Sequence, residues 1–350
     1  MHMDELMLHR LQGQFLLQRG QSRDVASGLC GLQAQFLRNA VHALRIRTIE
    51  PDVNGLVKTW TLRGTVHLLP EEDLPLYIRT CGNAEDVCES GWYRWVAGRG
   101  HANPQERERE LARMMAAAIA DGTDTREELR GYMRSLGMTE AEESRVFDPW
   151  GGMLRELAEM GVLAFRVDMA DRIHPDETKR YRLLQPFTPM REEAARIALA
   201  RRYLTHYGPV TLRDAAYFLH WTQAEAKAVF CQLPVETLAC EGRTYWHLPG
   251  SEELTEKMPE VILLAGFDPM MLGYRKEDNP FLPPEHLRGI FNLAGIVNPA
   301  ILLRGRVVGK WKESKGKVEL TAFEPVSAMD RQRIEEEAAR LYSVKKCVWK

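Results

Sequence analysis

Three segments of the chain repeat one order of hydrophobic and polar positions: helical spacing first, and then two short strand-like runs joined by a turn. Apolar residues three and four apart predict helices at residues 6–19 and 35–46, at 105–120, 125–136 and a stretch ending at 160, and at 194–207, 211–219 and 222–230. Strand-like runs follow at residues 56–62 and 65–70, 161–167 and 179–184, and 236–240 and 243–249. Helices followed by a hairpin are the order of a winged helix-turn-helix, so the pattern predicts three such domains in tandem.

The helix boundaries are clearest in the third segment. Thr211 and Thr222 each precede an apolar run, and Asp214 and Glu225 follow them by three residues. This spacing is that of a capping box, in which each side chain satisfies a backbone N–H of the other residue at the start of a helix. The sequence therefore predicts two short helices that begin just after the two threonines.

The pattern changes after Gly250. We predict strands at residues 260–264, 300–311 and 317–322, and a closing helix at 327–342 capped by Ser327. The predicted fold class is α+β, with winged-helix domains at residues 1–98, 99–187 and 188–252 and a β-rich C-terminal subdomain at 253–350.

Composition excludes several classes of protein. The 350 residues are 45% hydrophobic and 27% charged, as in an ordinary soluble protein, and the net charge is only −2. Binding to a nucleic acid would therefore depend on local basic patches. The six cysteines show no metal-binding spacing, and the chain has no phosphate-binding loop, so we expect no metal and no nucleotide cofactor. Without a signal peptide or a membrane span, we expect a cytoplasmic protein. We also expect it to be a monomer.

A short stretch with two glutamines is the first candidate site. Gln33 and Gln35 flank Ala34, shortly after Gly28 and Gly31. Side chains two residues apart diverge on a helix but lie on one side of an extended segment, and the glycines favour a non-helical backbone. The two amides are therefore either convergent groups at a helix entrance or solvated positions on an amphipathic helix.

Basic and aromatic residues surround this stretch in the sequence and could position a DNA backbone. They are Arg38, Arg45, Lys58, Arg63 and His67, with Trp60 as an aromatic face and Thr65 at the hairpin turn. His42 and Arg47 belong to the same basic group. The alternative is an ordinary solvated cationic surface, and a histidine on the polar face of a strand is more often a surface residue.

Two further stretches give weaker evidence for a functional site. The predicted recognition helix of the third segment has Lys227 as its only basic residue, so we expect it to pack inside the protein rather than read DNA. Asp268 precedes Pro269, and an aspartate before a proline is usually a turn-forming residue rather than a catalytic one.

Several stretches together resemble the winged-helix DNA glycosylases typified by AlkZ and YcaQ, which excise bulky alkylated bases and unhook interstrand crosslinks. They are residues 33–35, which form the Gln-hydrophobic-Gln motif of that family, and residues 59–67, 200–211, 264–275 and 305–311. The resemblance implies three tandem winged helices, a C-terminal β-barrel and catalytic roles for Gln33 and Gln35. Gln35 stands where YcaQ-type members usually have Asp, so the chain is more similar to the AlkZ branch.

The chemistry of two glutamines suits a particular substrate. An amide does not titrate near neutral pH, but its carbonyl can accept a hydrogen bond from water and its NH₂ group can donate one. An N7-alkylated purine is already cationic and leaves as a neutral base, so positioning and dipoles can supply the catalysis. We expect Gln35 to orient the water with Gln33 as its partner. His67 and Arg63 would line the same site or hold a nearby phosphate.

Two other functions are compatible with the sequence. A non-catalytic winged-helix regulator would need the folds but not the glutamines, and it would prefer one DNA sequence. A member with reduced catalysis would bind drugs or damaged DNA without turnover, although both glutamines are intact. The leading prediction is a monofunctional DNA glycosylase that acts on double-stranded DNA with alkylated bases, in DNA repair or in resistance to a genotoxin.

Overall fold

The computed structural model describes residues 2–79, 82–250, 254, 257–314, 316–342 and 346–350. By their contacts, the residues form two compact units that do not follow the order of the chain. Unit 1 contains Met1–Val53, Met169–Pro175 and Arg196–Lys350, and unit 2 contains Asn54–Asp168 and Asp176–Ala195. The domain boundaries expected from the sequence stay a prediction.

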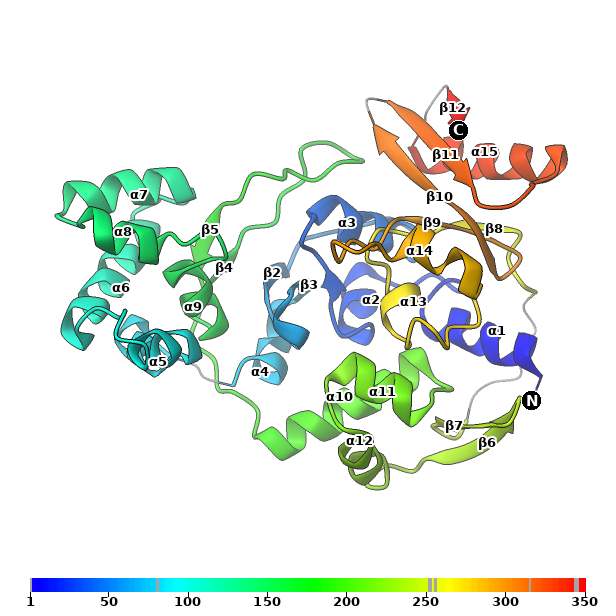
Figure 1. Ribbon diagram of the computed structural model, residues 1–350, viewed down its shortest axis with the longest axis horizontal. Coiled ribbons are helices and arrows are strands. Elements are labelled where there is room, and N and C mark those ends of the chain that lie inside the picture. Colours follow the sequence, from blue (N-terminus) through cyan, green and yellow to red (C-terminus); the bar gives the residue numbers. More distant parts are fainter. Residues whose placement is uncertain (1, 80–81, 251–253, 255–256, 315, 343–345) are drawn as a thin grey trace. The chain divides into compact units, whose positions relative to one another are not determined.

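Most predicted helices form within a few residues of their expected bounds (Figure 1). In the chain order the α-helices are α1 (Met3–Gly13), α2 (Ser22–Gly28), α3 (Leu37–Arg45), α4 (Leu74–Tyr77), α5 (Gly91–Ala97), α6 (Gln105–Ala120), α7 (Arg126–Ser135), α8 (Glu140–Val146), α9 (Met153–Glu159), α10 (Glu192–Tyr207), α11 (Leu212–Leu219), α12 (Gln223–Phe230), α13 (Pro269–Leu272), α14 (Leu287–Ile290) and α15 (Ala328–Tyr342). Short 3-10 helices lie at Leu62–Gly64, Glu71–Asp73, Ala84–Glu89 and Pro284–His286.

The predicted capping boxes are present. Thr211 and Thr222 accept hydrogen bonds from the backbone N–H groups of Asp214 and Glu225, at 3.1 Å each. The two carboxylates accept the backbone N–H groups of the threonines in return. The reciprocal bonds satisfy donors that a helix leaves unpaired at its start, which explains why α11 and α12 begin where they do.

The first predicted helix ends earlier than its periodicity indicates. We expected residues 6–19, but α1 ends at Gly13 and Phe15 has a left-handed backbone, with φ of 59°. Gln14 is buried, and its amide donates a 3.0 Å hydrogen bond to the hydroxyl of Tyr274. The ring of Phe15 stacks on His206 at 5.1 Å. These contacts with distant residues outweigh the local helical preference.

Unit 2 combines two antiparallel hairpins with a helical layer. β2 (Leu56–Trp60) pairs with β3 (Val66–Pro70), and β4 (Leu163–Phe165) pairs with β5 (Tyr181–Leu183). The two hairpins join through β2 and β4, where Lys58 lies opposite Phe165. Apolar side chains from α6, α7 and α9 pack on this sheet to form the core of the unit.

Unit 1 contains the remaining strands. They are β1 (Leu32–Gln33), the hairpin of β6 (Glu236–Cys240) and β7 (Arg243–His247), and the C-terminal strands β8 (Val261–Leu263), β9 (Ala300–Leu303), β10 (Arg306–Ser314), β11 (Lys317–Ala322) and β12 (Cys347–Trp349). The C-terminal strands form one sheet in the order β12-β11-β10-β9-β8. Its apolar residues pack with α13, α14 and α15 in one hydrophobic core.

The C-terminal sheet corrects one expectation. The family resemblance implied a β-barrel, but within the described part of the chain β8 and β12 are edge strands and the sheet is open. β12, which the sequence pattern did not predict, adds to β11 in parallel after α15. The mixed α+β class is confirmed, whereas the three winged helices stay a prediction.

The third segment corrects a second expectation. We expected its recognition helix, α12, to pack inside the protein. Ala226, Val229 and Phe230 are buried, but Gln223 and Lys227 lie on an exposed face. α12 is thus an amphipathic surface helix, and its exposed face carries a single basic side chain. Separately, no helix among the described residues is long and apolar enough to cross a membrane.

Candidate functional site

The two glutamines lie on a non-helical segment between α2 and α3. α2 is followed by two left-handed residues, Cys30 with φ of 58° and Gly31 with φ of 84°. Gly31 can adopt this conformation without strain, because it has no Cβ atom. Gly28 serves another purpose, since a Cβ there would lie 2.6 Å from the ring of His206. The predicted break in the helix before the glutamines is confirmed.

The burial of the motif alternates. Gln33 is half-buried, Ala34 is fully buried and Gln35 is exposed. Successive side chains of an extended segment point to opposite sides. Ala34 is thus anchored in the core, whereas Gln33 and Gln35 are more accessible, just before α3 begins at Leu37. This arrangement allows both amides to face one substrate.

α3 separates its basic residues into exposed and buried ones. Arg38 is exposed in the first turn, with its guanidinium 5.7 Å from the ring of Phe36. Arg47, just after the helix, is fully buried and forms an ion pair with Asp268 at 2.6 Å. Asp268 also accepts the backbone N–H of Met270 and caps α13. The interpretation of Asp268 as a turn-forming residue is confirmed, and Arg47 is structural rather than a contact for DNA.

His42 is the second member of the basic group that is buried. Its Nε2 lies 2.6 Å from the carbonyl of Leu263, and its Nδ1 lies 2.7 Å from the hydroxyl of Tyr342. The carbonyl can only accept, so Nε2 carries the proton and Nδ1 accepts the hydroxyl. Burial lowers the pKa of His42 to about 4, so the ring is neutral at pH 7. His42 therefore cannot act as a cation toward DNA.

His42, Trp311 and Tyr342 form an aromatic cluster at the base of a pocket. The ring of His42 stacks on Tyr342 at 5.5 Å and lies 4.7 Å from Trp311. The indole of Trp311 donates a hydrogen bond to the carbonyl of Leu264. Arg45 lies over the Tyr342 ring at 5.2 Å and donates a hydrogen bond to the carbonyl of Ile173. Each ring is held by a polar partner or a cation, so these aromatic side chains form a rigid floor of the pocket.

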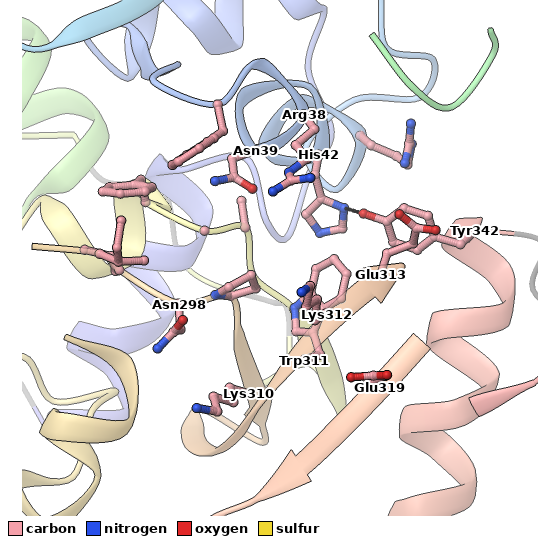
Figure 2. A pocket seen from close by; sticks show the side chains of 18 of the residues that line it. Arg38, Asn39, His42, Asn298, Lys310, Trp311, Lys312, Glu313, Glu319 and Tyr342 are labelled. Atoms are coloured by element: carbon pink, nitrogen blue, oxygen red, sulfur yellow. Dashed lines mark hydrogen bonds between the residues drawn. The ribbon is translucent and has the colours of Figure 1, made fainter. Parts of the chain in front are cut away.

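The pocket above this cluster has a volume of about 680 Å³. We call it the α3–β10 pocket, after the elements that contribute most of its charged side chains. Figure 2 shows Arg38 and Asn39 of α3 on one side and Asn298 and Lys310 on the other. Of the predicted site residues, Arg38 and Arg45 line this pocket.

The remaining predicted residues belong to the hairpin of β2 and β3, in unit 2. Lys58 is buried, with its ammonium 5.3 Å from the ring of Phe165. Burial lowers the pKa of Lys58, although Glu177 nearby partly opposes this effect. Trp60 is half-buried, and its ring lies 5.2 Å from that of Phe165. Both side chains thus pack on one aromatic ring, and their contact with DNA stays a prediction.

His67 differs from the surface residue that its strand position favoured. It is only 2% exposed. Its Nδ1 lies 2.9 Å from the hydroxyl of Thr61 and 3.1 Å from the carbonyl of Thr65. Burial, together with the nearby charge of Arg63, lowers the pKa of His67 to about 3. A neutral imidazole cannot hold a phosphate by charge, and the contact of His67 with DNA stays a prediction.

Arg63 and Thr65 shape the turn of this hairpin. Arg63 has a left-handed backbone, with φ of 58°, and the hydroxyl of Thr65 donates to the carbonyl of Leu62 at 3.1 Å. The turn is thus a single 3-10 turn closed by a threonine. The placement of these residues in the glutamine site stays a prediction.

Sequence reasoning missed most of the α3–β10 pocket. Lys310, Trp311 and Lys312 lie on β10, and Tyr342 ends α15. The alternation of β10 offered one signal, because Lys310 and Lys312 must share a strand face. Nothing in the sequence placed that strand beside α3. Among the described residues, no group of three or more His, Cys, Asp or Glu side chains is arranged to hold a metal ion.

Comparisons with known proteins match nearly the whole chain. The sequence model of the family described as "DNA glycosylase AlkZ-like" matches residues 26–344. A relative from Streptomyces sahachiroi named "Interstrand DNA cross-link repair glycosylase" is 29% identical over 352 residues, which cover 95% of this chain and 93% of the relative. The solved structure of the Streptomyces sahachiroi DNA glycosylase AlkZ has a TM-score of 0.76 and 25% identity, covering 100% of this chain and 99% of its own.

Proposed function

The chain belongs to the AlkZ-like DNA glycosylase family, and from this premise we propose that it hydrolyses the N-glycosidic bond of N7-alkylated or bulky cationic purines in double-stranded DNA. The proposal includes purines that form interstrand crosslinks, since the Streptomyces sahachiroi relative is named for crosslink repair. Membership in the family makes the protein a DNA glycosylase, and the choice of lesion is the proposed part.

The alternating burial of the motif supports a catalytic role for its two amides. Ala34 is fixed in the core, and Gln33 and Gln35 beside it would project together from a short segment anchored by α2 and α3. We assign Gln35, the exposed one, to the water and Gln33 to its support. The carbonyl of Gln35 would accept a hydrogen bond from the attacking water, and the amide of Gln33 would hold Gln35 or the sugar.

The absence of a carboxylate in the motif predicts which substrates react. Loss of the base builds positive charge on the sugar, and a base that is uncharged before the bond breaks must leave as an anion, which makes it a poor leaving group. An N7-alkylated purine carries its positive charge on the base before the bond breaks, so its departure needs no proton. Two oriented dipoles can then stabilise the transition state without a general base. We expect little activity on undamaged or neutral damaged bases.

The DNA backbone would be held by cations near the motif. Arg38 is exposed within three residues of Gln35, and it is the most accessible of the predicted contacts in unit 1. Arg63, Lys58, Trp60, Thr65 and His67 are proposed contacts from the β2–β3 hairpin, with His67 acting only as a neutral group. Tandem winged helices acting as a monomer in the cytoplasm complete the proposal.

Base release from a duplex carrying one N7-methylguanine tests the proposal. We would compare wild type with Gln33→Ala, Gln35→Ala and the matched control Gln18→Ala, which removes an exposed glutamine outside the motif. Removing one oriented polar group from an active site typically lowers kcat by about 100-fold or more, so we expect that loss for Gln35→Ala. DNA binding and the Gln18→Ala variant should stay close to wild type.

Two results would contradict the proposal. Equal activity of Gln35→Ala and wild type would remove the motif from catalysis. The lack of base release by wild type, from this duplex and from one carrying a nitrogen-mustard crosslink, would exclude alkylated purines of this class. A binding preference for one undamaged sequence would instead favour a winged-helix regulator.

A further inference from the structure

We propose that the α3–β10 pocket receives the bulky planar substituent of an alkylated purine, while Lys310 and Lys312 hold a phosphate of the same DNA strand at its rim. This inference rests on the proposed function and extends it, because it assigns the preference for bulky lesions to a site apart from the two glutamines. The pocket would select among adducts without taking part in bond cleavage.

The position of the pocket carries the first step of the argument. Phe36 directly follows Gln35, is 36% exposed and lines the pocket. Its ring lies 6.2 Å from that of Phe267, which lines the pocket as well. One wall of the pocket thus begins one residue after the motif along the chain, and we infer that a long substituent on a base held at the motif reaches around this segment into the pocket.

The volume and lining carry the second step. Pockets for drug-sized ligands have volumes of roughly 300–1,000 Å³, and 680 Å³ lies within that range. A methyl group would leave such a space nearly empty. Much of the lining is apolar, from Ala265, Phe267, Ile296, Val297 and Pro299. An apolar, flat group fits this space better than a sugar or a peptide does, and the exposed ring of Phe36 offers a surface for stacking.

The charged side chains of the pocket indicate what the bulky group is attached to. Arg38, Arg45, Lys310, Lys312 and Lys350 line the pocket, against the carboxylates of Glu313 and Glu319. Glu319 is paired with Lys350 at 2.6 Å, and Glu313 lies 3.8 Å from Nε2 of His174. In the described part of the chain, Lys310 and Lys312 have no carboxylate within ion-pair distance. A ligand with an anionic backbone complements this rim, as a DNA strand does.

The rigid base of the pocket carries the third step. Trp311 and Tyr342 are fixed by the hydrogen bonds described above, and both contact His42. Figure 2 shows the hydrogen bond between His42 and Tyr342 at this base. A surface that is ordered before binding loses little conformational entropy when a flat group stacks on it. The pocket is therefore built to bind, and not merely a gap between loops.

A comparison of two substrates tests the inference. We would measure base release from duplexes with one N7-methylguanine or one N7-(naphthylmethyl)guanine. The quantity compared is the kcat/KM value for the naphthylmethyl substrate divided by that for the methyl substrate. Phe36→Ala removes the exposed ring, Ile296→Trp fills the pocket, and Met329→Ala changes an exposed apolar residue outside it as the control. Loss of one aromatic stacking partner should lower the ratio about tenfold in Phe36→Ala. A similar fall is expected in Ile296→Trp and none in Met329→Ala.

Each other outcome has a defined meaning. An unchanged ratio in both pocket variants, or a ratio that falls equally in the control, would overturn the inference. If wild type releases neither base, the proposed function is contradicted. The role of the pocket is then tested by the affinity of the protein for the two duplexes. Duplexes with 2′-fluoro versions of the two adducts resist cleavage, because fluorine disfavours positive charge on the sugar. Tighter binding of the naphthylmethyl duplex that is lost in Phe36→Ala would retain the pocket, and equal binding of both duplexes would exclude it.

Discussion

Two pockets of unit 1 carry arginines and lysines, and they differ in how those charges are used. The smaller, about 290 Å³, lies beside α11, α12 and β7. Its two arginines, Arg213 and Arg243, both pair with Asp278, at 3.5 and 3.1 Å. In the α3–β10 pocket, Lys310 and Lys312 have no such pairing among the described residues. The larger pocket carries five arginines and lysines and the smaller one two, but the partners of these side chains, more than their number, separate a structural cluster from a surface that can accept an anion.

The availability of basic side chains also distinguishes the first predicted winged helix from the third. In the third segment, α12 exposes one basic side chain, Lys227, and the nearby arginines are paired with Asp278. In the first segment, α3 begins beside the glutamines and exposes Arg38. A shared order of helices and strands therefore does not imply a shared contact with DNA, because the side chains and their partners decide it.

The largest effect is expected on the free energy of unfolding when Arg47 is replaced, because its ion pair with Asp268 is fully buried. Arg47→Ala removes the partner of the fully buried carboxylate of Asp268. Breaking a buried ion pair from one side typically costs about 3–5 kcal/mol, so the free energy of unfolding should fall by that amount. Denaturant melts would measure it, with the exposed Arg288→Ala as a control. A loss of DNA affinity at unchanged stability would contradict the structural role of Arg47.

Lys310 and Lys312 should affect binding rather than stability. Lys310→Ala combined with Lys312→Ala removes two proposed phosphate contacts, and each contact contributes about 0.9 to the slope of log K against log salt. We expect the slope to fall by about 2 and the affinity for duplex DNA to fall about tenfold at moderate salt. Titrations at several salt concentrations would show it, with Lys227→Ala on α12 as the matched control. An unchanged slope would remove the two lysines from the DNA contact.

The arginines of the smaller pocket should matter little for DNA. Arg213→Ala combined with Arg243→Ala removes two side chains that are already paired with Asp278, so affinity should stay within about twofold of wild type. The same titrations would measure it. A fall as large as that of the two lysines would mean that pairing does not separate the pockets.

The smallest effect is expected from pH. Burial holds the pKa of His42 at about 4 and that of His67 at about 3, so both rings stay neutral at every pH above 6. Gln33 and Gln35 do not titrate, and we therefore expect kcat/KM to vary less than about twofold from about pH 6 to about pH 8.5. A bell-shaped profile within that range would require a titrating group that the proposal lacks.

Acid should act on stability instead. Both histidines have folded-state pKa values below the value of 6.5 expected in the unfolded chain, so the unfolded state binds protons first. Stability is then fully present above about pH 6.5 and is lost as pH falls toward 4.

Local sequence determined much of the fold. The capping boxes of Thr211 and Thr222, the extent of α6 and the bounds of β11 follow from residues a few positions apart, and they agree with the structure. The break before Gln33 was likewise predictable, because it depends on the conformational freedom of Gly31. These features rest on short-range hydrogen bonds and backbone preferences, which a single sequence displays directly.

Tertiary structure decided the rest. Gln14 and Phe15 end α1 early because their partners, Tyr274 and His206, come from far along the chain. Arg38 and Arg47 are chemically alike and nine positions apart, yet one is exposed and the other is held by Asp268. Burial and pairing depend on which distant residues come together, and no local pattern specifies them. The sequence by itself determined the helices, the hairpins and the glutamine motif, whereas the packing of distant segments decided which charges remain available to a ligand.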